Sequence, residues 1–159
     1  MGTEYGMSAP APSSPGVSER MSRQPSRNTT PEKALRSLLH ARGLRYRLHT
    51  KVPGAPRRTI DIAFPRDKVA VFIDGCFWHS CPAHGTNPKS NSEWWKNKLA
   101  RNVWRDYDTT MRLEEAGWLV LRYWEHENPL EVAEAVVFAK RVRESGTART
   151  YPRTPNTPA

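Results

Sequence analysis

Residues 68–84 have the sequence KVAVFIDGCFWHSCPAH. The first part, 68–73, is rich in β-branched residues and predicts a short strand. After Asp74 the composition changes, because residues 75–91 hold both cysteines of the chain among Gly, Pro, Ser and Asn, which predicts a loop. A carboxylate is therefore expected at the end of a strand, directly before a loop that contains several metal-binding residue types.

The elements on both sides follow from the spacing of apolar residues and from capping and turn residues. A first helix is expected to be capped by Thr30, to have Pro31 in its first turn and to end at Gly43. In the longest predicted helix, Val103 is expected on the apolar side. The other predicted elements are strands 44–50, 59–64 and 118–124 and helices 92–116 and 128–142.

The predicted order is α-β-β-β-α-β-α, which is an α/β arrangement. Strand 118–124 is almost wholly apolar, so we expect it to be central and buried. The order resembles the core of the restriction-endonuclease-like nucleases, in which a mixed sheet is flanked by helices. We therefore expect this fold class, with a structural zinc site added to it.

Length and charge limit the class of protein. The chain has 159 residues, which suits one domain, and a net charge of +9, which favours a polyanionic partner. Residues 1–28 and 144–159 have few aliphatic side chains, so we expect a disordered arm and a disordered tail around a folded domain at 29–143. The chain has neither a secretory leader nor an apolar run that could cross a bilayer. We expect a cytoplasmic, nucleoid-associated monomer.

Four residues have the types and the spacing of zinc ligands. Cys76 and Cys81 form a C-x4-C pair, His84 follows, and His126 lies just beyond the apolar strand. A Cys2His2 site would hold together a loop that has few aliphatic residues. The spacing is equally compatible with two buried free thiols and two surface histidines, and His79 could replace His84 as a ligand.

The carboxylates predict a magnesium site. Asp61 lies within a strand between two isoleucines, where a carboxylate is costly unless it is paired or bound to metal. Asp74 ends the next strand, and carboxylates on adjacent strands are typical of phosphodiester-cleaving sheets. His79 is near enough in sequence to act as a general base, and Glu32 on the first helix could face the same place. Alternatively, Asp61 is an edge-strand carboxylate and His79 a zinc ligand.

Aromatic and basic residues indicate contact with a nucleic acid. Phe77 and Trp78 lie between the cysteines, where a metal-fixed loop could present them for wedging between base pairs. By contrast, Trp104, Trp118 and Trp124 are expected to fill the core. Arg57, Lys98 and Arg101 are expected to contact phosphates, although a solvated helix face is an equally good explanation for any one of them. The full set of basic residues around the predicted site is Arg57, Arg58, Lys89, Lys96, Lys98, Arg101 and Arg105.

From about Met21 to about Arg141 the chain resembles the very short patch repair (Vsr-type) endonucleases. The Gly-Cys-Phe-Trp-His sequence at 75–79 is the most specific part of this resemblance. The other matching segments are Val52-Pro53-Gly54 leading to Asp61, Val71-Phe72-Ile73-Asp74, Glu93-Trp94-Trp95 followed by Lys98, Asn102 and Arg105-Asp106, and Gly117-Trp118 leading to Trp124-Glu125.

The resemblance implies roles for the residues of the site. It implies that Asp61 binds two magnesium ions, with the backbone carbonyl of Ile73 as a further ligand, and that Glu32 and Asp106 support them. It also implies that His79 acts in catalysis, which leaves one zinc ion to the two cysteines with His84 and His126.

The same resemblance assigns the contacts with DNA. Phe77, Trp78 and Trp95 would wedge into the base stack at a mismatch. Met21 would enter from the opposite groove on an N-terminal arm that orders on binding. The substrate implied is double-stranded DNA with a T:G mismatch, which arises when 5-methylcytosine deaminates. The enzyme would nick on the 5′ side of the mispaired thymine and leave a 5′-phosphate and a 3′-hydroxyl.

Two positions depart from the family pattern. Asp74 stands where a histidine is expected, so its role is open, and His126 stands where a cysteine is expected. Two other functions remain alternatives: a related nuclease with broader mismatch or lesion specificity, and a zinc-containing DNA-binding module without catalysis. A role in host restriction is a third, weaker alternative. Other mismatch-repair proteins are further candidate partners.

Overall fold

Seven elements form between Thr30 and Glu144, and their order confirms the prediction from the sequence. The computed structural model describes residues 9–11 and 27–146. The predicted arm, with Met21, lies outside the described residues except for 9–11 and 27–28, and the predicted tail does so beyond Gly146. The elements are α2 (Thr30–Ala41), β1 (Arg47–Val52), β2 (Ala55–Phe64), β3 (Val69–Asp74), α3 (Ser92–Glu115), β4 (Leu119–Trp124) and α4 (Pro129–Glu144).

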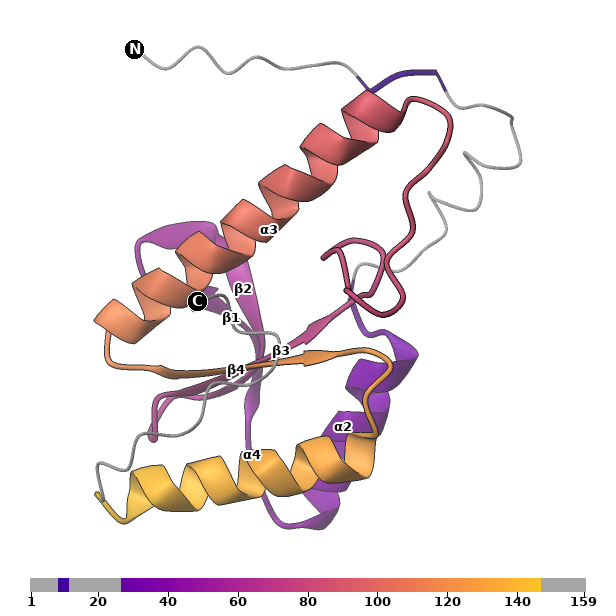
Figure 1. Cartoon of the computed structure of the whole chain (residues 1–159). Helices are drawn as coiled ribbons and strands as arrows, with labels where there is room; N and C mark the ends of the chain where they lie inside the picture. Colours follow the sequence, from indigo (N-terminus) through magenta and orange to yellow (C-terminus); the bar gives the residue numbers. More distant parts are fainter. Residues whose placement is uncertain (1–8, 12–26, 147–159) are drawn as a thin grey trace.

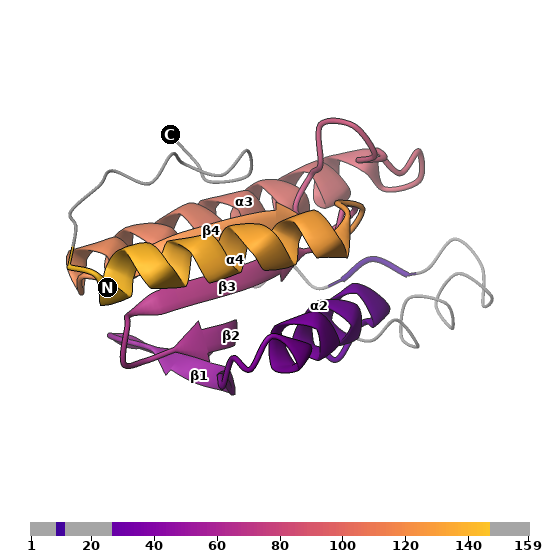
Figure 2. The ribbon, with the colours of Figure 1, turned by 90° about the horizontal axis from the view of Figure 1, so that it is seen from below.

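The four strands form one mixed sheet in the order β1-β2-β3-β4. β1 pairs with β2 and β2 pairs with β3 in antiparallel fashion. β4 runs parallel to β3, with α3 as the crossover between them. Helices α2 and α4 cover one face of the sheet and α3 lies on the other (Figures 1 and 2). The expected mixed sheet flanked by helices is therefore confirmed.

A separate apolar core lies on each face of the sheet. Between the sheet and the helices α2 and α4, the packing includes Leu35, Ile62 and Val136. Under α3, Ile60 and Leu113 pack together with residues of all four strands. Burial of side chains of this size stabilises the fold by about 2 kcal/mol each. The two cores hold the sheet rigidly, which fixes the edge where strands β3 and β4 end.

Three predictions about these elements were wrong. β4 is an edge strand rather than a central one; it is buried because helices cover both of its faces, which gives the same apolar pattern. On α3, Val103 is 41% exposed and Trp104 is 62% exposed, because the helix turns Leu99 and Leu113 inward instead. The cap of α2 is Thr29 and not Thr30, since the Thr29 hydroxyl accepts from the Glu32 N–H.

Within the part of the chain that the structure describes, no helix has the length and apolar character needed to cross a membrane.

Candidate active site and metal centre

The parallel pairing of β3 and β4 brings two distant segments of the chain together. Asp74, the last residue of β3, pairs in register with Trp124, the last residue of β4. The loop that follows β3 therefore meets the residues that follow β4, and the backbone N–H of Cys76 donates to Glu125 Oε1 at 2.7 Å. This junction, at the carboxyl ends of two parallel strands, carries two clusters of side chains that could bind a metal ion.

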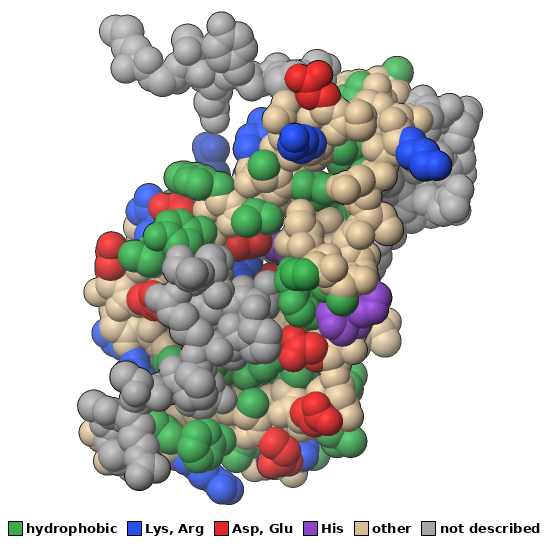
Figure 3. All heavy atoms as spheres, in the orientation of Figure 1, with side chains coloured by type: hydrophobic (Ala, Val, Ile, Leu, Met, Phe, Trp, Pro, Cys, Tyr) green, Lys and Arg blue, Asp and Glu red, His purple; other side chains and the backbone are tan. Residues whose placement is uncertain are grey.

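The four predicted zinc ligands gather at this junction. Their ligand atoms all lie within 4.8 Å of one another. Cys76 Sγ lies 3.0 Å from His126 Nδ1, and Cys81 Sγ lies 4.0 Å from His84 Nδ1. Both cysteines are free and buried, and both histidines are exposed. In Figure 3, histidine side chains gather on this side of the molecule, beside the loop between β3 and α3.

The chemistry of this set fits a tetrahedral zinc ion. Ligands about 2.0 to 2.3 Å from zinc are separated from one another by roughly 3.3 to 3.8 Å, close to the distances found here. Burial, followed by the effect of neighbouring Cys81, raises the pKa of the Cys76 thiol to about 12. A cation is what would favour the thiolate at such a place. His79 is not a member of this cluster.

His79 lies in a second cluster, with two carboxylates. Its Nδ1 donates to Asp106 Oδ2 at 2.5 Å and lies 3.7 Å from Asp74 Oδ1. Burial opposes protonation of the ring, but the hydrogen bond with Asp106 and the charges of both carboxylates outweigh it, so the pKa of His79 is raised. A proton kept at Nδ1 by Asp106 makes Nε2 the atom that can accept another.

A buried arginine on β4 joins the same two carboxylates. Arg122 is 2% exposed, and its Nε and Nη2 donate to the two carboxylate oxygens of Asp74 at 2.9 and 2.8 Å. Its Nη2 also lies 3.0 Å from Asp106 Oδ1, and its guanidinium carbon lies 4.5 Å from the centre of the Phe72 ring. Burial opposes the charge, but the two carboxylates outweigh it and raise the pKa of Arg122.

Asp61 reaches the site from β2. The backbone N–H of Ile73 donates to Asp61 Oδ2 at 3.0 Å. Burial raises the pKa of Asp61 to about 7; the hydrogen bond from Ile73 opposes this rise, and the nearby charges of Glu32 and Asp74 add to it. Glu32 is 5% exposed at the start of α2, where it accepts a hydrogen bond from the Asn28 N–H.

A local irregularity in the β1–β2 pair accompanies Asp61. His49, opposite Asp61 by the register of the flanking pairs, has a left-handed backbone with φ of 51°. Ile60 packs in the core under α3, whereas Ile62 packs in the core on the other face. Regular alternation would place both isoleucines on one face. Such irregularities commonly re-aim a side chain beside an active site, and here the side chain between the two isoleucines is the carboxylate of Asp61.

A cavity of about 670 Å³ lies in front of these residues. It is bounded by the start of α2, the end of β3, the loop after it and the middle of α3. Glu32, Ile73 and His79 line it, and with Phe77, Trp78, Lys98 and Asp106 seven of the predicted site residues share one cavity. The remaining lining residues are Thr29, Thr30, Pro31, Gly75, Asn102, Arg105 and Glu125.

The predicted wedge residues form one aromatic cluster at the rim of this cavity. The ring of Phe77 lies 5.0 Å from that of Trp78 and 5.4 Å from that of Trp95, measured between centroids. Trp94 packs against Trp95 at 4.9 Å. Phe77, Trp78 and Trp95 are all half-buried. The loop and the first turn of α3 therefore present a connected aromatic surface.

The predicted basic residues divide into three groups. Lys98 and Arg105 line the cavity. Arg57 and Arg101 are exposed but do not line it. Arg58 is held within the fold instead, because its Nη1 donates to Asp108 at 2.5 Å.

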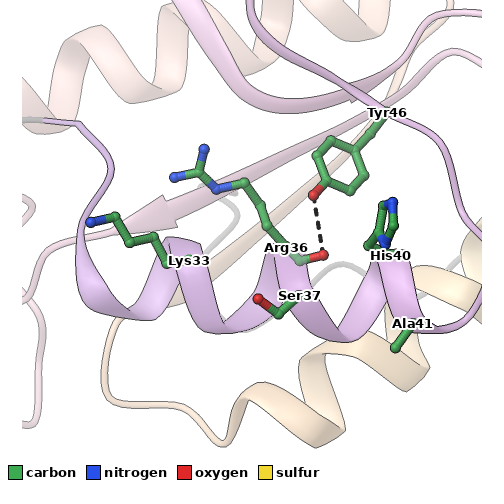
Figure 4. A pocket seen from close by; sticks show the side chains of 6 residues that line it. All are labelled: Lys33, Arg36, Ser37, His40, Ala41 and Tyr46. Atoms are coloured by element: carbon green, nitrogen blue, oxygen red, sulfur yellow. Dashed lines mark hydrogen bonds between the residues drawn. The ribbon is translucent and has the colours of Figure 1, made fainter.

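A second cavity, of about 560 Å³, lies on the outer side of α2 beside β1. Figure 4 shows its lining side chains, which include Lys33, Arg36 and His40. The Tyr46 hydroxyl donates to the carbonyl of Arg36 at 3.1 Å across it. Its lining residues include no carboxylate, in contrast to the cavity in front of His79. The candidate chemistry therefore lies in the first cavity.

The sequence prediction missed three residues of the site. Arg122 carried a usable signal, since a charged residue inside an apolar strand needs a partner. Glu125 holds the Cys76 N–H, and Asn102 Nδ2 donates to the carbonyl of Trp78 at 3.0 Å. Both residues stand in segments that match the family, but the two contacts could not be foreseen, because each depends on how the loop folds back.

Comparisons with known proteins identify the family of this chain. The family model described as DNA mismatch endonuclease Vsr matches residues 15–84. The chain is 47% identical over 130 residues to the type II nicking enzyme V.NaeI of Lentzea aerocolonigenes, which covers 80% of this chain and 78% of that protein. It is 44% identical over 104 residues to the type II nicking enzyme V.XorIIP of Xanthomonas oryzae pv. oryzae, covering 64% of this chain and 74% of that one.

The DNA mismatch endonuclease Vsr of Escherichia coli is 38% identical over 101 residues, which are 62% of this chain and 62% of that protein. The matched family region ends at His84 and so includes Asp61, His79 and both cysteines. The chain belongs to the Vsr family of DNA endonucleases.

Proposed function

We propose that this protein is a magnesium-dependent endonuclease that nicks double-stranded DNA on the 5′ side of the mispaired thymine at T:G mismatches. The cut would leave a 5′-phosphate and a 3′-hydroxyl and would initiate very short patch repair. The proposal rests on one observation: His79, which is hydrogen-bonded to Asp106, lines the same cavity as Ile73 at the end of β3. The backbone N–H of Ile73 in turn donates to the Asp61 carboxylate. The relatives named as nicking enzymes support cleavage of one strand.

Asp61 and the backbone carbonyl of Ile73 would hold two magnesium ions. The donor set suits a hard cation, because Asp61 is a buried carboxylate with a pKa of about 7 and its charge needs a partner. Glu32 is another buried carboxylate, and it lines the cavity together with Ile73. When bound, magnesium supplies charge stabilisation to the attacking and leaving oxygens of the phosphodiester.

His79 would accept the proton of the attacking water at Nε2. Asp106 keeps the other nitrogen protonated and fixes the plane of the ring. Asp74 does not need to bind metal in this scheme, because both of its carboxylate oxygens accept from Arg122. Lys98 lies in the same cavity, where a cation can contact a phosphate of the DNA.

The aromatic cluster would select the substrate. Phe77, Trp78 and Trp95 form the surface that would enter the base stack, and a mismatched step costs less to unstack than a paired one. Arg57 and Arg101, both exposed, would contact phosphates farther from the cut. Met21, outside the described residues, is proposed to approach the DNA from the opposite groove.

Cys76, Cys81, His84 and His126 would hold one structural zinc ion that fixes the loop carrying Phe77, Trp78 and His79. The mixed sheet with its two helical layers is proposed to be of the restriction-endonuclease-like type.

Substitution of the two central residues tests the catalytic assignment. We expect Asp61→Ala and His79→Ala to fold and to retain zinc, and to nick a mismatched duplex at least about 100-fold more slowly than the wild type in magnesium. Lys140→Gln, a variant far from the site, is the control and should nick at the normal rate. Full activity of either site variant would refute its assignment. Binding without nicking by the wild-type protein, in magnesium and in manganese, would favour the non-catalytic DNA-binding module instead.

A further inference from the structure

Arg122 connects three elements through the two carboxylates that contact His79. It projects from β4 and meets Asp74 at the end of β3 and Asp106 in the middle of α3. At 2% exposure it is shielded from solvent, so it is not placed to contact DNA directly. Any effect of Arg122 on cleavage must therefore pass through the groups that it holds.

The contacts of Asp106 are divided between two partners. Its Oδ1 lies 3.0 Å from Arg122 Nη2, and its Oδ2 accepts from His79 Nδ1 at 2.5 Å. Asp74 is held at both oxygens by Arg122, and its Oδ1 lies 3.7 Å from His79 Nδ1. The guanidinium of Arg122 thus contacts both carboxylates that lie close to Nδ1 of His79.

Only a planar guanidinium can make this set of contacts. Two parallel bonds to one carboxylate and a third contact to another need donors in a fixed fork, which a lysine ammonium does not have. Carboxylates contributed by Asp61 and Glu32 also surround this place, so removal of the arginine would leave the cluster with a large excess of negative charge. The two aspartates would then separate or rotate, and the ring of His79 would lose its fixed orientation.

We propose that Arg122 is a positioning residue of the nuclease, which holds Asp74 and Asp106 so that His79 keeps Nδ1 bonded and Nε2 directed at the substrate. This role rests on the proposed function of His79 as the proton acceptor. Asp74 belongs to the same unit, as the anchor that keeps the guanidinium in its plane. The cluster of Asp74, Asp106 and Arg122 therefore acts on the reaction only through the histidine.

Steady-state nicking by Arg122→Gln and Arg122→Lys tests the proposal. Since Arg122 does not reach the DNA, we expect Arg122→Gln to lower kcat by about 100-fold while KM for the duplex changes by less than about 2-fold. Arg122→Lys restores the charge without the fork, so it should recover part of the loss, to within about 10-fold of the wild type. Asp74→Asn combined with Arg122→Gln should be little slower than Arg122→Gln alone, because both substitutions break one unit.

A spectroscopic readout separates positioning from loss of structure. At a pH high enough for the ring to be neutral, ¹⁵N NMR of the zinc-loaded wild type should show His79 with its proton fixed at Nδ1, whereas Arg122→Gln should show exchange between the two ring nitrogens. Lys140→Gln, which removes a partly buried ion pair with Asp67, is the control for a general loss of stability and should leave the His79 spectrum and kcat unchanged. If Arg122→Gln does not fold, Arg122→Lys carries the same two measurements.

The proposal fails if a folded Arg122 variant nicks at the wild-type rate, or if the loss appears in KM while the His79 spectrum is unchanged. These outcomes differ from failure of the proposed function, in which the wild-type protein itself does not nick the mismatched duplex.

Discussion

Asp61 shows how a single buried carboxylate couples the stability of the fold to the chemistry of the site. It accepts one hydrogen bond, from Ile73, and its pKa is raised to about 7 mainly by burial. Without a cation, ionisation of this group therefore works against folding. The residue that would hold magnesium is the same residue that weakens the metal-free protein at neutral pH.

The sign of this coupling gives a first prediction. The unfolded chain releases the Asp61 proton near pH 4 and the folded protein near pH 7, so the contribution of Asp61 to stability is full below about pH 4 and is lost as pH rises through about 7. Asp61→Asn removes this titration and keeps an acceptor for the Ile73 N–H. In the absence of magnesium, we expect the variant to be more stable than the wild type by about 4 kcal/mol at about pH 8, since one pKa unit corresponds to about 1.4 kcal/mol.

Urea unfolding of both proteins in EDTA-free, magnesium-free buffer measures the difference, and it should vanish near about pH 4. Equal stability of the two proteins at high pH would contradict the burial of an ionisable Asp61.

Individual site residues were largely predictable from the sequence. Asp61 and His79 stood out because a charged or titratable group inside an apolar or metal-type segment needs a reason to be there. Arg122 obeys the same rule and was missed, since its partners Asp74 and Asp106 are 48 and 16 residues away. The sequence shows that Arg122 needs a partner of opposite charge, but it does not show which carboxylate that partner is.

The loop after β3 gains its shape from backbone contacts around the proposed zinc ligands. The N–H of Cys81 donates to the carbonyl of Cys76 at 2.9 Å, and the N–H of Gly85 donates to the carbonyl of Cys81 at 2.7 Å. A side chain at Gly85 has no room, because a Cβ there would lie 2.5 Å from the Cys81 carbonyl oxygen. The position next to His84, a proposed ligand, therefore requires glycine.

Gly85→Ala is predicted to weaken the metal centre selectively. The added methyl group must displace the backbone of Cys81, so we expect zinc affinity to fall by at least about 10-fold and nicking to fall with it. Competition with a chromophoric chelator measures the affinity. Ala83→Ser, an exposed neighbour in the same loop, is the matched control and should bind zinc normally. Unchanged affinity in Gly85→Ala would show that the close contact of Gly85 with the Cys81 backbone does not position the zinc ligands.

Most elements were predicted within a few residues, but the place of β4 in the sheet was not. The apolar run 118–124 suggested a central strand, and β4 is instead an edge strand between two helical layers. An apolar pattern reports that both faces of a strand are covered, and it does not report how many neighbours the strand has. The exposure of Trp104 has a related cause. An apolar residue type predicts burial only where another layer of the fold covers that side of the helix.

Across the whole molecule, a net charge of +9 accompanies a candidate site that is itself acidic. Five carboxylates gather near the cavity, and Lys98 and Arg105 line its side on α3; the carboxylates are those of Glu32, Asp61, Asp74, Asp106 and Glu125. A polyanion is thus attracted by the molecule as a whole, while the acidic centre accepts it only together with cations. This arrangement agrees with a family of DNA endonucleases.

Salt dependence tests the contribution of the basic residues. If Lys98 contacts a phosphate, Lys98→Gln should weaken duplex binding and lower the slope of log K against log salt by about 1. Lys140→Gln removes the same charge on α4 at a partly buried ion pair and should leave the slope unchanged. Equal slopes for wild type and Lys98→Gln, measured by fluorescence anisotropy, would show that Lys98 contacts no phosphate.

The central claim is that this molecule cuts one strand of DNA at a T:G mismatch, and a panel of defined duplexes tests it most directly. Matched, T:G, and other mismatched duplexes, each with either strand end-labelled, are incubated with the zinc-loaded protein in magnesium, and the products are resolved at single-nucleotide resolution. We predict one cut, in the thymine strand of the T:G duplex, on the 5′ side of the mispaired base. Cleavage of both strands, equal cleavage of the matched duplex, or no cleavage of any duplex would contradict the account.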